Sequence, residues 1–415
     1  MKNKISNWLY RLLRESQKYT GTDNVYLAKG GFWLILGQGI SLGASFLLTL
    51  AFANLLSPTA YGNYKYALAL FGMLEIFSLV GMKTAVSQAV ARGLEGSFYT
   101  GFKTQLKFGS LGSLAAIGAA TYYWMRGNEV LPIPLLIAAV FLPLMNASRI
   151  YLSFLEGKKL FRIQTIYSTL NQIILVAIII GALFFTENPF WLIAVYLVSH
   201  TVLGYTLYFI TKLKFKPNKN EDPKTISYGI NLSVMGVISQ IATYLDKILI
   251  FTFIGSGELA IYSFATVFPE QIQNILGKIS TLAMPKLAPK SREEIRMGIM
   301  KKFWKLALLV GIIIVSYIVI APYFYRIFFP RYLASTFYSQ ILMFSAVSVP
   351  AGFLGTVFQA KMMKKELYLI KIAPLINIAL LPILVPLYGI WGAIMAFLGT
   401  QVFKAGLVLF LFRKF

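Results

Sequence analysis

Two long apolar runs dominate this sequence, IILVAIIIGALFF at residues 173–185 and LALLVGIIIVSYIVI at residues 306–320. Neither run alternates polar with apolar residues, as a strand of a membrane β-barrel would over about ten residues. Crossing a hydrocarbon core of about 30 Å takes roughly 20 predominantly apolar residues in a helix. Comparable runs lie at about residues 30–54, 62–83, 104–124, 132–153, 163–185, 190–211, 227–254, 260–283, 304–322, 336–358, 369–386 and 388–411. We therefore predict an all-α polytopic membrane protein with about 12 transmembrane helices.

The composition supports this fold class and excludes several others. Of the 415 residues, 57% are hydrophobic and 13% charged, whereas soluble domains carry about 25% charged residues. A disordered chain is excluded, and a water-soluble enzyme is disfavoured. The absence of cysteine excludes disulfides and thiolate chemistry, and the one histidine, His200, excludes a histidine-cluster metal site.

The placement of charges predicts the orientation. Lysine and arginine gather in alternate loops, whereas the opposite loops hold only a few charges of each sign. Cytoplasmic loops are the ones enriched in Lys and Arg, so both termini are predicted to be cytoplasmic. The basic clusters are Lys158-Lys159, Lys212–Lys224, Lys286–Lys305 and Lys361–Lys371. The formal net charge of +24 is thus a topology signal, and a nucleic-acid partner is not predicted.

The first 26 residues are polar and basic, without the apolar core of a signal peptide. Apolar residues recur there at helical spacing, at Ile5, Trp8, Leu9, Leu12 and Leu13. This pattern predicts a helix that lies on anionic membrane lipids. A poorly ordered basic tail is the alternative.

An internal repeat divides the chain. A shift of 198 residues aligns the first two spans with the seventh and eighth, placing Ser41 on Ser239, Ser45 on Thr243 and Tyr64 on Tyr262. We predict an N-terminal six-helix lobe at 27–211, a cytoplasmic linker at 212–226 and a C-terminal six-helix lobe at 227–415. Six crossings return the chain to its starting side, so the lobes are parallel repeats, as in transporters that rock two lobes around a central site.

Polar residues form stripes along corresponding spans of the two halves. Such groups are costly in lipid and normally face protein or water, so we expect them to line a central cavity. The candidates for its polar lining are Gln38, Ser41, Ser45, Thr49, Ser239, Thr243, Gln273 and Asn274. The charged residues in these spans are Lys65, Glu75, Asp246, Lys247, Glu270 and Lys278. Because Asp246 and Lys247 are adjacent, we expect their side chains to point in different directions.

Two structural interpretations compete with this reading. Long side chains near cytoplasmic helix ends can extend to the lipid headgroups, which would account for Lys83, Arg149, Lys278 and Lys404. Serine and threonine stripes also occur at ordinary helix–helix contacts, where small groups let backbones approach. His200 is interpreted as a packed polar residue.

The sequence resembles a known protein family. Residues 27–77, LAKGGFWLILGQGISLGASFLLTLAFANLLSPTAYGNYKYALALFGMLEIF, look like the opening of O-antigen (Wzx-type) polysaccharide-biosynthesis flippases. These are members of the multidrug/oligosaccharidyl-lipid/polysaccharide exporter superfamily. Residues 228–265, YGINLSVMGVISQIATYLDKILIFTFIGSGELAIYSFA, are similar to the start of their second half. The motifs are diffuse, and they include no catalytic signature.

The resemblance implies a transport function in the bacterial cytoplasmic (inner) membrane. The expected substrate is an undecaprenyl-diphosphate-linked oligosaccharide, moved from the inner to the outer leaflet by alternating access. A polysaccharide polymerase and a chain-length regulator are the protein partners that the family suggests. No enzymatic activity and no cofactor are expected.

The candidate residues for this function come from placement alone. A lipid diphosphate requires cationic partners in a site of low dielectric constant, and Lys65, Arg149, Lys247 and Lys278 are the candidates. Glu75, Asp246 and Glu270 are candidates for coupling transport to a proton or sodium gradient, since intramembrane carboxylates often do so. The alternative is that these acids are counter-ions of the lysines.

Other functions remain open. A multidrug or cation antiporter of the same superfamily would favour an acidic cavity, whereas the spans here hold more basic than acidic residues. A lipid II flippase would resemble chains of fourteen spans. A membrane glycosyltransferase or polymerase would need acids on a sizeable outer loop, and the loop at about 323–335 has none. A scaffold protein would not require matched polar stripes.

Overall fold

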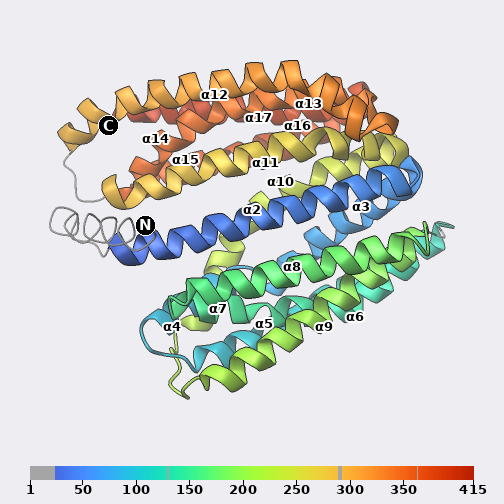
Figure 1. Cartoon of the computed structure of the whole chain (residues 1–415), viewed down its shortest axis with the longest axis horizontal. Coiled ribbons are helices and arrows are strands. Elements are labelled where there is room, and N and C mark those ends of the chain that lie inside the picture. The colour runs from blue at the N-terminus through green and yellow to red at the C-terminus, as the bar shows by residue number, and fades with distance from the viewer. Residues whose placement is uncertain (1–23, 129, 288–291, 362) are drawn as a thin grey trace, which may run out of the picture. The chain divides into compact units, whose positions relative to one another are not determined.

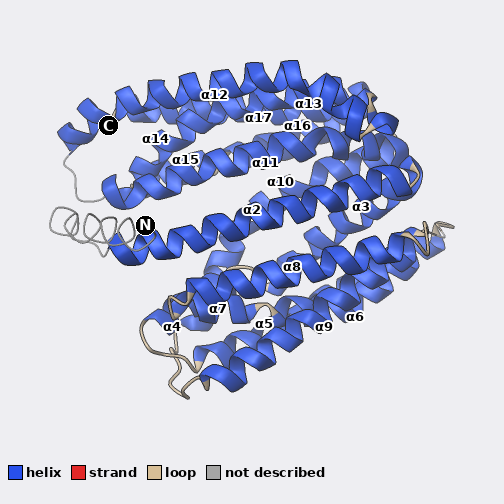
Figure 2. Ribbon diagram, viewed as in Figure 1, coloured by secondary structure: helices blue, strands red, loops and turns tan. Residues whose placement is uncertain are grey.

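The computed structural model describes residues 24–128, 130–287, 292–361 and 363–415, and all the regular secondary structure in these ranges is helical. Figure 2 shows these residues as helices joined by short loops, with no strand among them. The all-α prediction is confirmed. The predicted interfacial helix within residues 1–26 lies almost entirely outside the described residues.

The chain divides into two compact units, which are described separately. Unit 1 comprises residues 24–51, 74–186 and 191–235 of the described chain, and unit 2 comprises residues 52–73, 187–190 and 236–415. The helix α10 (Thr225–Phe253) contributes its first turns to unit 1 and the rest to unit 2. The lobe boundaries expected at 211 and 227 stay a prediction.

Unit 1 is built from seven α-helices and one short 3-10 helix, shown from blue to green in Figure 1. They are α2 (Asn24–Leu55), η1 (Glu75–Ser78), α4 (Met82–Ala91), α5 (Ser97–Met125), α6 (Pro132–Ser148), α7 (Ile150–Gly157), α8 (Phe161–Leu183) and α9 (Pro189–Phe215). Helices α5 and α6 pair along their length, and α4 packs against α7. The core between α4, α5 and α7 includes Met82, Val86, Phe98 and Phe154.

Unit 2 holds α3 (Pro58–Leu74) and the C-terminal helices. These are α11 (Ser256–Leu287), α12 (Arg292–Phe328), η2 (Pro330–Tyr332), α13 (Ala334–Met343), η3 (Phe344–Val347), α14 (Ser348–Ala360), α15 (Lys364–Ile370), α16 (Ala373–Tyr388) and α17 (Ile390–Arg413). Helix α14 packs against α11, α12 and α17, and α16 pairs with α17. Gly389 joins these last two helices with φ 62° and ψ −135°, a conformation that favours glycine.

The predicted spans correspond closely to the observed helices. Within the described residues, nine helical stretches are long and apolar enough to cross a membrane, and a tenth is the pair 58–78 and 82–91, bent by 49°. These ten cover all but two of the predicted ranges. The remaining ranges, 104–124 and 260–283, fall within α5 and α11, which are 29 and 32 residues long but more polar. Lengths of about 44 and 48 Å suffice for a crossing. The protein is therefore a multi-pass membrane protein, and the total of twelve spans stays a prediction.

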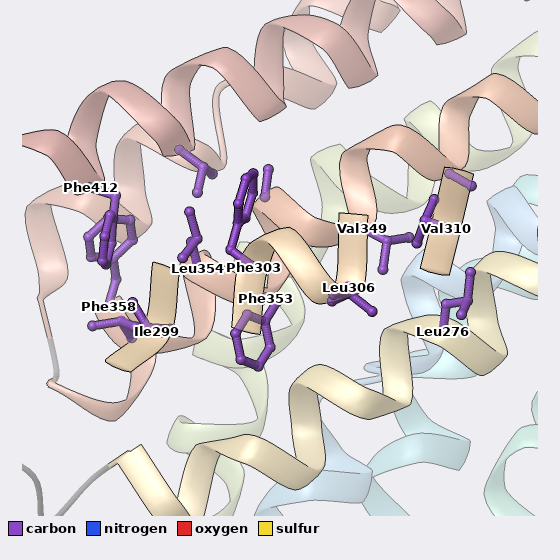
Figure 3. Packing of buried hydrophobic residues seen from close by; sticks show 14 of the residues in the cluster. Leu276, Ile299, Phe303, Leu306, Val310, Val349, Phe353, Leu354, Phe358 and Phe412 are labelled. Carbon is purple, nitrogen blue, oxygen red and sulfur yellow. The ribbon is translucent and has the colours of Figure 1, made fainter. Parts of the chain in front are cut away.

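Helix α12 shows why unit 2 belongs in lipid. Its residues Ile299, Phe303, Leu306, Val310 and Ile314 follow the spacing of one helical face and are buried against α14 and α17. Figure 3 shows Ile299 near Phe358 and Phe412, and Val310 near Val349. The opposite face is equally apolar, yet Leu308 and Val315 are 68% and 63% exposed within the described structure. A helix that is hydrophobic on all sides with one face uncovered is typical of a membrane span.

The linker between α9 and α10 is fastened to the loop that follows α4. Gly96 donates its backbone N–H to the carbonyl of Asn220 at 2.8 Å, and Asp222 pairs with Arg92. The backbone N–H of Asp222 also bonds to the hydroxyl of Ser97 at 3.0 Å. The predicted basic linker is thus an ordered strap within unit 1.

Candidate functional site

A polar cavity of about 650 Å³ lies inside unit 2, in a region of otherwise apolar helices. Helices α10, α11, α16 and α17 supply most of its lining. Its charged residues are Asp246, Lys247, Glu270 and Lys404. The uncharged polar residues are Ser239, Thr243, Tyr244, Tyr262, Thr266, Gln273, Asn274, Asn377, Thr400 and Gln401. Because polar groups at membrane depth normally face protein or water, this cavity is the candidate functional site.

The polar stripes predicted on α10 and α11 both reach this cavity. Ser239, Thr243, Asp246 and Lys247 come from α10, and Glu270, Gln273 and Asn274 come from α11. One of these side chains also joins two elements, since Gln273 of α11 donates to the hydroxyl of Ser345 in η3 at 2.6 Å. Thr243 donates to the carbonyl of Ser239 at 2.8 Å, within α10. These residues line a cavity of unit 2, and the central cavity shared by both halves, like their roles, stays a prediction.

The side chains of Asp246 and Lys247 lie close together, contrary to the expectation that side chains of adjacent residues would point in different directions. The ammonium of Lys247 lies 3.7 Å from Oδ1 of Asp246, and both residues line the cavity. The flexible four-carbon stem of lysine lets its ammonium return towards its neighbour although the Cα–Cβ bonds diverge. The expectation was wrong because it considered the direction of Cβ alone.

Other donors already occupy the carboxylate of Asp246. The hydroxyl of Tyr262 donates to Oδ2 at 2.6 Å, and the backbone N–H of Lys247 donates to Oδ1 at 2.7 Å. The Lys247 ammonium is farther away, beyond hydrogen-bond distance. It can therefore turn to an anionic ligand while Asp246 keeps both hydrogen bonds.

Lys65 is not part of the cavity lining but interacts with residues that are. It is on α3, and its ammonium sits 5.5 Å from the centre of the Tyr61 ring. It interacts electrostatically with Lys247 and Glu270. Lys65 thus adds positive charge to the Lys247 surroundings. Hydrogen bonding and stacking hold α3 in unit 2, since Gln240 donates to the carbonyl of Gly72 at 2.9 Å and Tyr66 stacks on Phe251.

Four polar lining residues from α16 and α17 are not among the predicted site residues. They are Asn377, Thr400, Gln401 and Lys404. A Lys404 side chain that reaches the headgroups is one of two interpretations of the sequence, and in the structure this residue lines the cavity. Its spacing of four residues from Thr400 places both on one helical face. Asn377 aligns with Asn171 when the sequence is shifted by 206 residues. This match within the internal repeat is a signal that could have identified Asn377 as a candidate site residue.

The remaining predicted site residues lie in unit 1, or their side chains lie outside the described residues. Gln38, Ser41, Ser45 and Thr49 are on α2, within unit 1. The hydroxyl of Ser45 accepts a hydrogen bond from Gln172 of α8 at 3.3 Å, and Thr49 donates to the Ser45 carbonyl at 2.8 Å. The side chain of Lys278 lies outside the described residues.

A second charged group occurs within unit 1. Lys83 on α4 interacts electrostatically with Glu75 of η1 and with Arg149, which lies between α6 and α7. His200 of α9 interacts with Arg149 as well and packs edge-on against Tyr196, with ring centres 4.5 Å apart. Glu75 and Arg149 thus belong to unit 1, whereas Lys247 belongs to unit 2.

Neither a metal centre nor a catalytic constellation distinguishes the cavity. In the described portion of the chain, no three His, Asp or Glu side chains are placed to hold a metal ion. The paired charges and amide or hydroxyl groups suit the binding of a polar ligand. Cations that can exchange partners would contact its anionic parts, and neutral acceptors would contact its hydroxyl or N–H groups.

Comparison with known proteins identifies sequence and fold relatives. Residues 27–289 match the family model described as "Polysaccharide biosynthesis protein". A search of curated proteins finds no match. Among solved structures, the chain is similar to the lipid II flippase MurJ in an inward closed conformation, with a TM-score of 0.70 and 16% identity over 93% of this chain and 87% of that one.

Two further structures show the same architecture. An outward-facing multidrug resistance MATE family transporter of the MOP superfamily aligns with a TM-score of 0.62 and 14% identity, over 93% of this chain and 95% of that one. A MOP superfamily transporter from Pyrococcus furiosus, whose title describes a binding pocket of reverse polarity, aligns at 0.61 with 13% identity, over 93% and 96%. At these identities the similarity shows a shared fold.

Proposed function

The chain belongs to the polysaccharide biosynthesis protein family, and on this basis we propose that it is a lipid-linked oligosaccharide flippase. The proposed substrate is an undecaprenyl-diphosphate-linked oligosaccharide, such as an O-antigen or other surface polysaccharide repeat unit. Transport takes place by alternating access in the cytoplasmic membrane of a bacterium, with both chain termini on the cytoplasmic side. The fold shared with MurJ and the MATE transporters supports a transport mechanism.

The observation that supports an anionic substrate is the arrangement of cations in unit 2. Lys247 and Lys404 line the cavity, and Lys65 interacts electrostatically with Lys247. Two acids, Asp246 and Glu270, share the lining, but Tyr262 and a backbone N–H already occupy Asp246. A diphosphate gains strong charge-assisted hydrogen bonds from such lysines. Arg149 and Lys83 of unit 1 are a second cationic group that the headgroup would contact during transfer.

Asp246 and Glu270 are proposed to couple transport to a proton or sodium gradient, or to act as counter-ions of the lysines when no substrate is bound. Glu75 of unit 1 has the same two proposed roles. A polysaccharide polymerase and a chain-length regulator are the proposed partners downstream of transport.

The decisive experiment measures on which leaflet the lipid-linked glycan is found. Cells depleted of the protein are expected to accumulate the undecaprenyl-diphosphate oligosaccharide on the cytoplasmic face, and a plasmid copy should reverse this. An unchanged distribution in depleted cells would contradict the proposal.

A cation antiporter is the second candidate, favoured by the two carboxylates in the cavity and by the fold shared with MATE transporters. It predicts altered drug susceptibility with normal leaflet distribution of the glycan. A lipid II flippase, suggested by the MurJ fold, predicts accumulation of the peptidoglycan precursor instead.

A further inference from the structure

Asn377 belongs to the cavity lining and has a buried hydrogen-bond acceptor that is unused among the described residues. It lies on α16, lines the cavity and is only 7% exposed. Its Nδ2 donates to the carbonyl of Ala242 at 3.4 Å, whereas its Oδ1 accepts no hydrogen bond from any of the residues that the structure describes. A buried amide oxygen without a partner is unfavourable, so a ligand that supplies a donor would be stabilised there.

The orientation of this amide follows from its neighbour. The carbonyl of Ala242 is an acceptor only, so it requires the NH₂ group of Asn377 on its side. Turning the amide over would place two acceptors against each other. The atom left for the ligand is therefore the oxygen.

Thr400 adds a second acceptor to the same cavity. It lies on α17, which pairs with α16, and it is 8% exposed. Its hydroxyl donates its proton to the carbonyl of Ala396 at 2.8 Å. Since a hydroxyl has one proton and two lone pairs, its remaining capacity is as an acceptor. Asn377 and Thr400 thus offer acceptors to a shared space.

The charges around these acceptors favour a neutral donor over a cation. Lys404 lies one turn beyond Thr400 on α17 and lines the same cavity, so its ammonium would repel a cation bound there. Two acids of the lining could offset this repulsion, and both already interact with other groups. Asp246 accepts a hydrogen bond from Tyr262 and pairs with Lys247, and Glu270 interacts electrostatically with Lys65 and Lys247. A sugar supplies neutral donors through its hydroxyl groups and through the N–H of an acetamido substituent.

We propose that Asn377 and Thr400 form a sugar subsite, in which their oxygens accept hydrogen bonds from the first sugar next to the diphosphate. This inference rests on the proposed flippase function and adds to it. The lysines of the cavity bind the diphosphate, and the subsite on α16 and α17 recognises the saccharide attached to it.

The test compares two lipids on the purified full chain in nanodiscs. One is undecaprenyl diphosphate without sugar, and the other is the same lipid bearing a single N-acetylhexosamine. We expect wild-type protein to bind the sugar-bearing lipid about tenfold more tightly, as expected for one or two added hydrogen bonds. Asn377→Ala and Thr400→Val should each reduce this preference to about twofold or less while leaving the affinity for the sugar-free lipid unchanged.

A matched control is available in unit 1. Asn171, on α8, also has a buried Oδ1 without a partner among the described residues, but it does not line this cavity. Asn171→Ala should keep the tenfold preference. Thermal unfolding of each variant checks that the fold is intact, and Thr400→Val, which preserves shape, tests the subsite if Asn377→Ala does not fold.

Several results would overturn the subsite. One is an unchanged sugar preference in both variants, and another is an equal loss of affinity for the two lipids. A third is sodium-dependent binding that Asn377→Ala abolishes, because it would assign the oxygens to a cation. Failure of the flippase proposal looks different, since the sugar-free lipid would then bind wild-type protein and Lys247→Gln equally weakly.

Discussion

The hydroxyl of Tyr262 donates a 2.6 Å hydrogen bond to Oδ2 of Asp246, across the cavity wall formed by α11 and α10. Tyr262 is 2% exposed, so this bond is shielded from water. It fixes one oxygen of the carboxylate, and the backbone N–H of Lys247 fixes the other. Because other donors hold both carboxylate oxygens of Asp246, the Lys247 ammonium is available to an anionic ligand.

Replacing Tyr262 by phenylalanine should therefore weaken substrate binding. Without the hydroxyl, Asp246 can rotate towards Lys247 and form a closer ion pair, which competes with the ligand. Since hydrogen bonds to charged groups contribute about 1.5–3 kcal/mol, we expect roughly 10-fold weaker binding of undecaprenyl diphosphate. The measurement is a binding titration in nanodiscs.

A double-mutant cycle separates this effect from general destabilisation. In an Asp246→Asn background, Tyr262→Phe should change the affinity little, because the competing charge has gone. Additive losses from the two substitutions would argue against the positioning role of Tyr262.

Charge reversal at Lys247 should abolish transport without lowering the amount of protein. A glutamate at this position would lie beside Asp246 and would repel a diphosphate. Lys247→Gln should reduce binding by about 10- to 100-fold, which corresponds to losing one charge-assisted interaction. The readout is the leaflet distribution of lipid-linked glycan, with immunoblotting of the membrane fraction. A fully active Lys247→Glu variant would refute the role of this residue.

A methyl group at Gly62 should destabilise unit 2. A Cβ there would lie 1.8 Å from the carbonyl oxygen of Ser256, a backbone atom that cannot move aside easily. Overpacking of this kind costs about 1–3 kcal/mol or more. We expect Gly62→Ala to lower the unfolding temperature in detergent.

A glycine on the neighbouring helix α11 provides a control for Gly62→Ala. Gly257 lies on the first turn of α11, and a Cβ at this position would have no heavy atom of the described neighbours within 4 Å. Gly257→Ala should therefore unfold close to the wild-type temperature. Equal destabilisation by both substitutions would contradict the close approach of α3 and α11.

The strap between α9 and α10 should loosen in acid. The backbone N–H of Lys224 and the side chain of Arg92 hold the pKa of Asp222 below its ordinary value of 3.8. A lowered pKa means that the charged carboxylate stabilises the folded strap. This contribution is complete above pH 3.8 and is lost as the pH falls through the lowered pKa of the folded state.

Spin labelling can follow this transition. The chain has no cysteine, so a single cysteine at Lys219 carries one nitroxide. We expect its mobility to rise as the pH falls below 3.8, and Asp222→Asn should show the mobile spectrum at neutral pH. Glu221→Gln, a change at the neighbouring exposed acid, should leave the spectrum unchanged. Equal mobility in all three proteins would contradict the strap.

The helices were predictable because lipid restricts the backbone so strongly. With no water to satisfy peptide groups, an apolar run of about twenty residues has to form a helix. The polar stripe of Ser239, Thr243 and Asp246 was also readable, since its helical spacing alone places these residues on one face. Asn377 and Lys404 were harder, because a single polar residue in an apolar helix does not reveal which neighbour it faces.

Sequence alone thus determined the helical membrane fold, the approximate spans and the candidate polar faces of α10 and α11, because these depend on local periodicity and on the solvent. Tertiary structure decided which faces share a cavity. It joined Asn377 and Lys404 to Lys247, placed α3 in the same unit as α11, and directed the Lys247 ammonium back towards Asp246. These relationships depend on helix packing and side-chain rotamers, which are set by contacts between residues far apart in the chain.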